Sequence, residues 1–243
     1  NAASGCTATD VVIVNVNTTP PTANGGNGGT ITCTSNTSGI QIGTAAVAGN
    51  TYSWLPATGL SATNIAQPTA NPTSTTTYTV TVTGSNGCTA TATVTINVNK
   101  TVPTADAGAD KNLNCTTTST TIGTAGVVGN SYSWSPATGL SSTTVAQPTA
   151  NPTATTTYTV TVTNSASGCT ATDVVIVNVN TTPPTANAGL DKTLNCTTTS
   201  TQIGSAAIAG NTYGWSPSNG LSATNVAQPM ASPSMTTSYT VTV

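Results

Sequence analysis

The sequence is almost free of charge: only 3% of its 243 residues are charged, against about 25% in ordinary proteins. It contains no histidine and no phenylalanine, and its net charge is −2. Without histidine, neither a Ser-His-Asp triad, nor a Cys-His pair, nor a histidine metal site can be built. The electrostatic field of so few charges is also too weak to attract nucleic acid or an anionic membrane. The composition predicts a protein that is not an enzyme, holds no cofactor and binds no nucleic acid.

The sequence also lacks long apolar runs and the 3.6-residue apolar period of a helix. We therefore expect no membrane span. Valine and isoleucine instead alternate with threonine. In residues 155–163, Tyr158, Val160 and Val162 lie on one side of a predicted strand and threonines on the other. This alternation predicts an all-β fold.

Three tryptophans mark an internal repeat of about 81 residues. The predicted domains are residues 18–99 (repeat 1), 100–180 (repeat 2) and 181–243 (repeat 3, which lacks its last strand), preceded by residues 1–17 as the last strand of a preceding or neighbouring repeat. About seven short β runs around one tryptophan in each period predict a tandem Ig-like β-sandwich. The predicted core residues are Trp54, Trp134, Trp215, Tyr78, Tyr158 and Tyr239.

Six cysteines recur at the same repeat positions, with no CxxC motif. This pattern indicates disulfides rather than metal ligands, and hence an extracellular setting. Pairing within each repeat predicts Cys33–Cys88 and Cys115–Cys169. The remaining Cys6 is then expected to bond Cys196 of a preceding copy.

Residues 1–17 repeat residues 164–180 with one difference, Ala2 in place of Ser165. Repeat 3 ends at Val243 without this strand. Two explanations stay open. Residue 243 continues into another copy of residue 1, or residues 1–17 complete repeat 3 of a neighbouring copy by donor-strand assembly. In both, the expected partner is another copy of this sequence.

Three motifs carry a resemblance to known proteins: 103–110 (PTADAGAD), 132–140 (YSWSPATGL) and 155–163 (TTTYTVTVT). They resemble the tandem Ig-like and PKD-like repeats of very large secreted surface proteins of gliding bacteria. The resemblance implies a bacterial cell-surface adhesin or filament, secreted by a type IX-like pathway, with surface glycans as further partners. Repeat 1 departs from the opening motif at residues 25–29 (GGNGG), and the aspartate-rich PKD signature after the tryptophan is absent.

Acidic residues in the repeat openers are weak calcium candidates, namely Asp106, Asp110 and Asp191. Calcium takes six to eight oxygen ligands, usually from several carboxylates. One or two carboxylates per repeat therefore favour solvated turns, and we expect no metal site.

The last strand carries apolar residues on both faces: Val11 and Ile13 recur as Val174 and Ile176 where repeat 1 has threonines. Such strands are usually covered, so we expect this face to pack on a neighbouring repeat or strand.

With proline in each linker, the sequence predicts an extracellular stalk, fibre or filament with an adhesive role. The alternative is a carbohydrate-binding or accessory module of a secreted enzyme, which requires an exposed aromatic strip such as Tyr52, Tyr132 and Tyr213.

Overall fold

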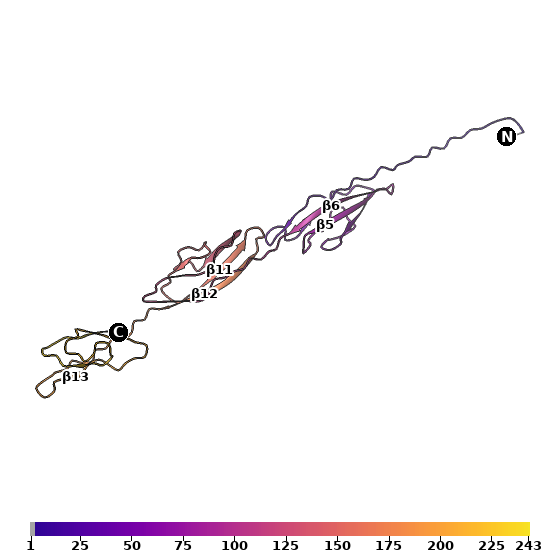
Figure 1. Cartoon of the computed structure of the whole chain (residues 1–243). Helices are drawn as coiled ribbons and strands as arrows, with labels where there is room; N and C mark the ends of the chain where they lie inside the picture. The colour runs from indigo at the N-terminus through magenta and orange to yellow at the C-terminus, as the bar shows by residue number, and fades with distance from the viewer. Residues whose placement is uncertain (1–2) are drawn as a thin grey trace. The chain divides into compact units, whose positions relative to one another are not determined.

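The computed structural model describes residues 3–243, so the first two residues of the predicted 1–17 strand lie outside the described residues (Figure 1). Over the described range every regular element is a β-strand, which confirms the all-β fold of tandem Ig-like repeats. No helix in this range is long and apolar enough to cross a membrane. The chain forms two compact units, one of residues up to 112 with 119–178, the other of residues 113–118 with 179–243.

Repeat 1 contains a four-stranded and a two-stranded sheet. The larger sheet has the order β1-β6-β5-β3, and β2 pairs with β4. Strand β1 runs parallel to β6, whereas the other pairs are antiparallel. The strands are β1 (Gly29–Ile31), β2 (Ile40–Gln41), β3 (Thr51–Leu55), β4 (Thr69–Ala70), β5 (Thr76–Thr83) and β6 (Thr89–Val98).

Repeat 2 reproduces this topology with the order β7-β12-β11-β9 and the pair β8–β10. Its last strand in the chain, β12, is therefore an interior strand, and Figure 1 shows it beside β11. The strands are β7 (Lys111–Asn114), β8 (Thr120–Thr121), β9 (Asn130–Ser135), β10 (Thr149–Ala150), β11 (Thr156–Asn164) and β12 (Thr170–Asn180).

Repeat 3 forms only two small sheets, β13 with β15 and β14 with β16. The segment that corresponds to β7, residues 192–195, belongs to no strand. The strands are β13 (Thr201–Gln202), β14 (Gly214–Ser216), β15 (Met230–Ala231) and β16 (Thr240–Thr242).

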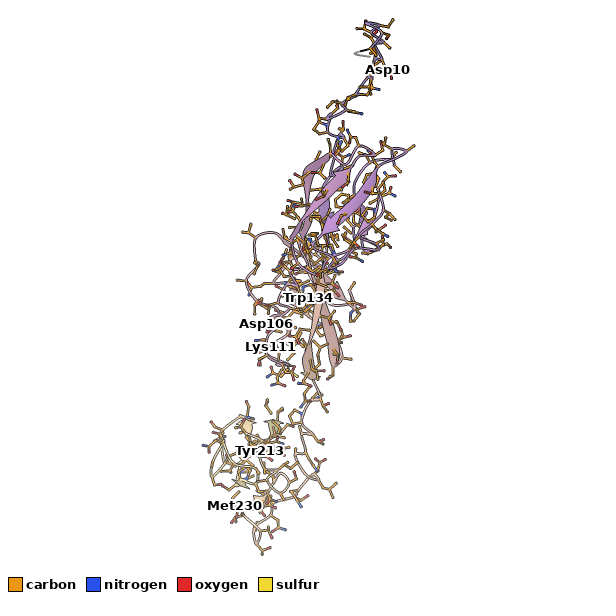
Figure 2. All side chains as sticks on the ribbon, turned by 90° about the vertical axis from the view of Figure 1, so that its right-hand side faces the viewer. Asp10, Asp106, Lys111, Trp134, Tyr213 and Met230 are labelled. Carbon is orange, nitrogen blue, oxygen red and sulfur yellow. A yellow bond between two sulfur atoms is a disulfide. The ribbon has the colours of Figure 1, made fainter. Side chains whose placement is uncertain are left out.

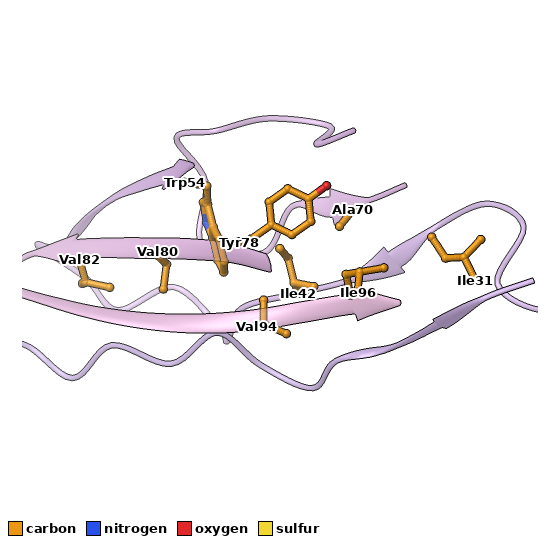
Figure 3. Close-up of a cluster of buried hydrophobic side chains, with 9 residues drawn as sticks. All are labelled: Ile31, Ile42, Trp54, Ala70, Tyr78, Val80, Val82, Val94 and Ile96. Atoms are coloured by element: carbon orange, nitrogen blue, oxygen red, sulfur yellow. The ribbon is translucent and has the colours of Figure 1, made fainter. Parts of the chain in front are cut away.

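The core of repeat 1 is built around Trp54 and Tyr78, which are 1% and 0% exposed (Figure 3). Their polar atoms are satisfied inside the repeat: Trp54 Nε1 donates to the Ile65 carbonyl at 2.9 Å, and the Tyr78 hydroxyl donates to the Thr58 carbonyl at 2.7 Å. A large aromatic group can thus be buried without an unpaired donor. Burial raises the pKa of Tyr78 and that of its counterpart Tyr158.

The predicted disulfide pairing within repeats is wrong. Cys33 of repeat 1 is bonded to Cys169 of repeat 2, with the Cα atoms 5.1 Å apart. The parallel pairing of β1 with β6 explains the error. Ile31 lies opposite Val98, which is ten residues along β6 from Cys88, and ten residues at 3.3 Å per residue span about 33 Å. Cys33, two residues beyond Ile31, therefore lies past the end of β6 that is far from Cys88. The predicted Cys115–Cys169 pair fails because Cys169 is already bonded to Cys33.

Candidate assembly site

A groove with a volume of about 830 Å³ opens in repeat 3. One side is lined by residues 188–194 of the opener and the other by residues 233–239, which lead into β16. The core tryptophan Trp215 also lines it. The corresponding segments of repeat 2 are β7 and β11, and β12 lies between those two strands. The groove in repeat 3 therefore lies at the position that β12 occupies in repeat 2.

Core positions of repeat 3 are more exposed than their counterparts in repeat 2. Tyr158 and Val160 are 0% and 1% exposed, whereas Tyr239 and Val241 are half-buried. Ile122 is fully buried, and the equivalent Ile203 is half-buried. Without the interior strand, one side of this core is open to water.

Trp215 nevertheless keeps its place in the core of repeat 3. It is 5% exposed, and its Nε1 donates to the Val226 carbonyl at 2.9 Å, as Trp134 Nε1 does to the Val145 carbonyl. The Tyr239 hydroxyl donates to the Asn219 carbonyl at 2.6 Å, which matches the bond of Tyr158 to Thr138. The half of repeat 3 on the tryptophan side is thus formed as in the complete repeats.

Two carboxylates bind β12 to the opener of repeat 2. Asp110 Oδ1 accepts a hydrogen bond from the Ile176 amide, and Asp173 Oδ2 accepts one from the Ala107 amide, both at 2.8 Å. Hydrogen bonds to ionised groups are stronger than those between neutral groups. Repeat 1 has Gly28 and Ala92 at these two positions. Repeat 2 therefore has both aspartates and repeat 1 has neither, a difference that is visible in the sequence and that the calcium interpretation of Asp110 left unused.

Asp106, the other calcium candidate of repeat 2, accepts the Gly108 amide at 2.8 Å and so closes its own turn. Asp191 is exposed and lines the groove of repeat 3. Within residues 3–243, no three acidic or cysteine side chains gather closely enough to hold a metal ion.

Residues 5–17 are exposed and belong to no strand, and Asp10 lies on this segment (Figure 2). Val12 and Val14 are 85% and 78% exposed, whereas their counterparts in β12, Val175 and Val177, are completely buried. The sequence that forms the interior strand of repeat 2 thus also exists in the chain as an exposed, extended segment.

The apolar residues predicted for assembly lie outside the cores. Val174 and Ile176 are on the outward face of β12, 54% and 36% exposed, and Val11 and Ile13 are exposed as well.

The tyrosines beside the tryptophans do not form an exposed strip. Each is half-buried, and its hydroxyl accepts a backbone amide five residues earlier, from Val47, Val127 and Ile208 for Tyr52, Tyr132 and Tyr213 respectively.

No protein-family model and no curated protein sequence matches the chain. Among solved structures, a three-domain fragment of titin is 10% identical with a TM-score of 0.47, covering 90% of each chain. A fragment of the titin I-band is 10% identical with a TM-score of 0.46, covering 92% of this chain and 93% of that one. Extracellular domains 3–5 of Drosophila OTK are 10% identical with a TM-score of 0.31, covering 88% and 86%. The strands described above define a protein of tandem Ig-like β-sandwich repeats.

Proposed function

We propose that this chain is the repeating unit of an extracellular fibre or surface stalk with an adhesive role and no catalytic activity. Residues 18–99, 100–180 and 181–243 are the three repeats. Residues 1–17 of one copy are the last strand of repeat 3 in the preceding copy. The observation that carries the proposal is the groove between residues 188–194 and 233–239, together with an exposed segment whose sequence is that of the strand filling this place in repeat 2.

The pairing in repeat 2 gives the register of the donated strand. Tyr158 lies opposite Val175, and Val160 opposite Asp173. In repeat 3 this corresponds to Tyr239 opposite Val12 of the donor, and Val241 opposite its Asp10. The other edge follows from repeat 1, where Ile31 of the opening strand pairs in parallel with Val98 of the last strand. The corresponding pair in repeat 3 is Leu194 with the donor's Val16. The donated strand is therefore hydrogen-bonded along both of its edges.

The two carboxylate hydrogen bonds of repeat 2 can form in repeat 3 only when the donor strand supplies one aspartate and the acceptor repeat supplies the other. Asp191 takes the place of Asp110 and accepts the donor's Ile13 amide. The donor's Asp10 takes the place of Asp173 and accepts the Ala188 amide. Repeat 1, with Gly28 and without this pair, has a different opener. These two bonds favour residues 5–17, rather than a strand like β6, in the groove of repeat 3.

Burial supplies the driving force for donation. Moving an exposed valine into a core contributes about 1.5–3 kcal/mol, and Val12 and Val14 both make this change. Ordering the backbone costs about 1–2 kcal/mol per residue. The two valines alone do not offset that cost over the whole segment. The added burial of Tyr239, Val241 and Ile203 and the hydrogen bonds along both edges are therefore required.

Assembly of the purified full chain tests the proposal. We expect concentration-dependent fibres in electron microscopy and large species in sedimentation. The double variant Val12→Asp/Val14→Asp should remain monomeric, since it places two charges in the core of the acceptor. Both residues are exposed in the separate chain, so the monomer still folds. The matched control, Thr7→Asp/Thr9→Asp, adds the same charges on the outward face and should still assemble. Equal assembly of both variants would refute the proposal.

A variant with one threonine and then residues 1–17 appended after Val243 reproduces the length of the turn before β12. It separates the two sources of the strand. If the unmodified chain stays monomeric and only the appended variant protects Val241 from hydrogen exchange, the strand comes from continuation of one polypeptide. Assembly of separate copies is then excluded.

The outward apolar residues supply a second contact in the proposed fibre. Val174 and Ile176 are exposed, and they pack on a neighbouring repeat or strand. Val174→Thr/Ile176→Thr restores the residues of repeat 1 at these positions and should leave the monomer folded. We expect less bundling of fibres in electron micrographs, and unchanged bundling would contradict this contact.

A further inference from the structure

The disulfide between repeats follows a rule that extends across the junction between copies. Cys33, the opening cysteine of repeat 1, is bonded to Cys169, which precedes the last strand of repeat 2. Applied to every junction, this bond gives the rule that the opening cysteine of one repeat bonds the late cysteine of the next repeat. Opening cysteines are Cys33, Cys115 and Cys196, and late cysteines are Cys88, Cys169 and Cys6, the last of which belongs to the donated strand.

We propose that two disulfides link each pair of neighbouring copies, Cys196 of one copy to Cys88 of the next, and Cys115 of one copy to Cys6 of the next. Together with Cys33–Cys169, these bonds use all six cysteines. Cys88, Cys115 and Cys196 are in no disulfide in the described chain. The inference rests on the proposed donor-strand assembly, because Cys6 reaches repeat 3 only on the donated strand.

Repeat 1 already holds Cys88 in the position that the rule requires. Before Cys169, the Ser167 hydroxyl donates to the Thr101 carbonyl of the linker at 2.6 Å, and the Ser167 carbonyl accepts the Cys33 amide at 2.9 Å. Asn86 holds the equivalent place in repeat 1, two residues before Cys88. Its side-chain amide donates to the carbonyl of Thr19 at 3.0 Å, and Thr19 is the counterpart of Thr101.

The same contact determines which cysteine of the preceding copy is near Cys88. Asn86 also donates to the Asn17 carbonyl at 3.3 Å. Asn17 ends the donated strand, and its counterpart Asn99 donates its amide to the Ile31 carbonyl, two residues before Cys33. In the assembly, Asn17 therefore lies beside Leu194 of the preceding copy, two residues before Cys196. The turn that bears Cys88 is held at this point.

The second bond follows from the other end of repeat 3. Cys115 is exposed, and its Sγ lies 3.7 Å from the Thr181 carbonyl in the linker to repeat 3. The donated strand brings Ser4 and Cys6 as the counterparts of Ser167 and Cys169. Ser4 then bonds the linker at Thr182, as Ser167 bonds Thr101, and Cys6 reaches Cys115.

Each bond forms by thiol–disulfide exchange with a small-molecule or protein disulfide of the oxidising compartment. Two protein thiols become one disulfide, and the oxidant is released as two thiols that carry both protons and both electrons. We expect fibres to form first under reducing conditions and to become covalent when oxidised glutathione is added.

Peptide mapping by mass spectrometry of oxidised fibres tests the pairing. We expect the linked peptides Cys88–Cys196 and Cys6–Cys115, and a ladder of covalent oligomers in a non-reducing gel. The variant Cys88→Ser/Cys115→Ser should lose the ladder completely and still form fibres. Either single variant, Cys88→Ser or Cys115→Ser, should retain the ladder through the other bond. A Cys6–Cys196 peptide, or unreacted Cys88 thiol in fully oxidised fibres, would overturn the inference.

The appended-strand variant tests the disulfide rule even if separate copies do not assemble. In that monomer, the appended copy of Cys6 should bond Cys115 within one chain, as Cys169 bonds Cys33. A bond from the appended cysteine to Cys196 would show that the rule is wrong even if fibres never form. Absent fibres together with the expected Cys115 bond would refute only the linkage between separate copies.

Discussion

Repeats 2 and 3 have nearly the same sequence at their core positions but differ in what fills the space between the opener and the penultimate strand. In repeat 2, β12 fills it, and Val160 and Ile122 are buried. In repeat 3 this space is a groove, and Val241 and Ile203 are half-buried. One strand thus decides whether the same residues make a closed core.

The largest effect is expected from closing the groove. Appending one threonine and then residues 1–17 after Val243 should stabilise repeat 3 against unfolding by several kcal/mol, because both open edges become paired and the valines of the strand become buried. A gain of 2 kcal/mol corresponds to a rise in Tm of roughly 8–16 °C for a domain of this size. Hydrogen exchange of peptides covering residues 203–243 measures it. Unchanged hydrogen exchange in these peptides would show that the groove does not accept the appended strand.

Equivalent valines should differ according to their surroundings. Val175→Ala should destabilise repeat 2 by about 2 kcal/mol, since it removes two buried methyl groups and leaves a cavity. Val12→Ala should leave the stability of the separate chain unchanged, because Val12 is 85% exposed. Denaturant unfolding compares the two variants. In the appended-strand variant, the copy of Val12 should become as sensitive as Val175.

The carboxylates should show the same contrast at a smaller scale. Asp110→Ala should cost repeat 2 about 1 kcal/mol, because the Ile176 amide loses its acceptor. Asp191→Ala should not change the separate chain, but it should weaken assembly, measured as a higher critical concentration for fibres. Asp106→Ala is the control on assembly, since Asp106 only closes its own turn. An equal rise in critical concentration for Asp106→Ala would contradict the role given to Asp191.

The smallest effect concerns pH. Burial raises the pKa of Tyr158, so above about pH 10 the unfolded chain loses the phenolic proton while folded repeat 2 retains it. Stability is therefore fully present below pH 10 and decreases as the pH rises through the folded-state pKa. Urea unfolding at pH 9 and 11 measures the loss for repeat 2. Tyr158→Phe should reduce this dependence, and an unchanged slope would contradict the assignment.

Much of the repeat could be predicted from the residues. The Thr/Val alternation of residues 155–163 predicts β11, and the structure has that strand at Thr156–Asn164 with Val160 and Val162 buried. The disulfides could not be predicted, because the sequence does not show that the opening strand runs parallel to the last one. The residue type also did not distinguish two interpretations of Asp110, a calcium ligand or an acceptor for a backbone amide. Only the position of the facing strand distinguishes them.

The sequence by itself determined the local periods: where strands alternate, where the chain turns, and that three similar units follow one another. These depend on neighbouring residues and on the alternation of side chains along an extended chain. Only the tertiary structure decided which strands are adjacent, that Cys33 meets a cysteine of the next repeat, and that repeat 3 has an open groove. Pairing between distant segments depends on the direction and order of strands in a sheet, which the local pattern of residues does not specify.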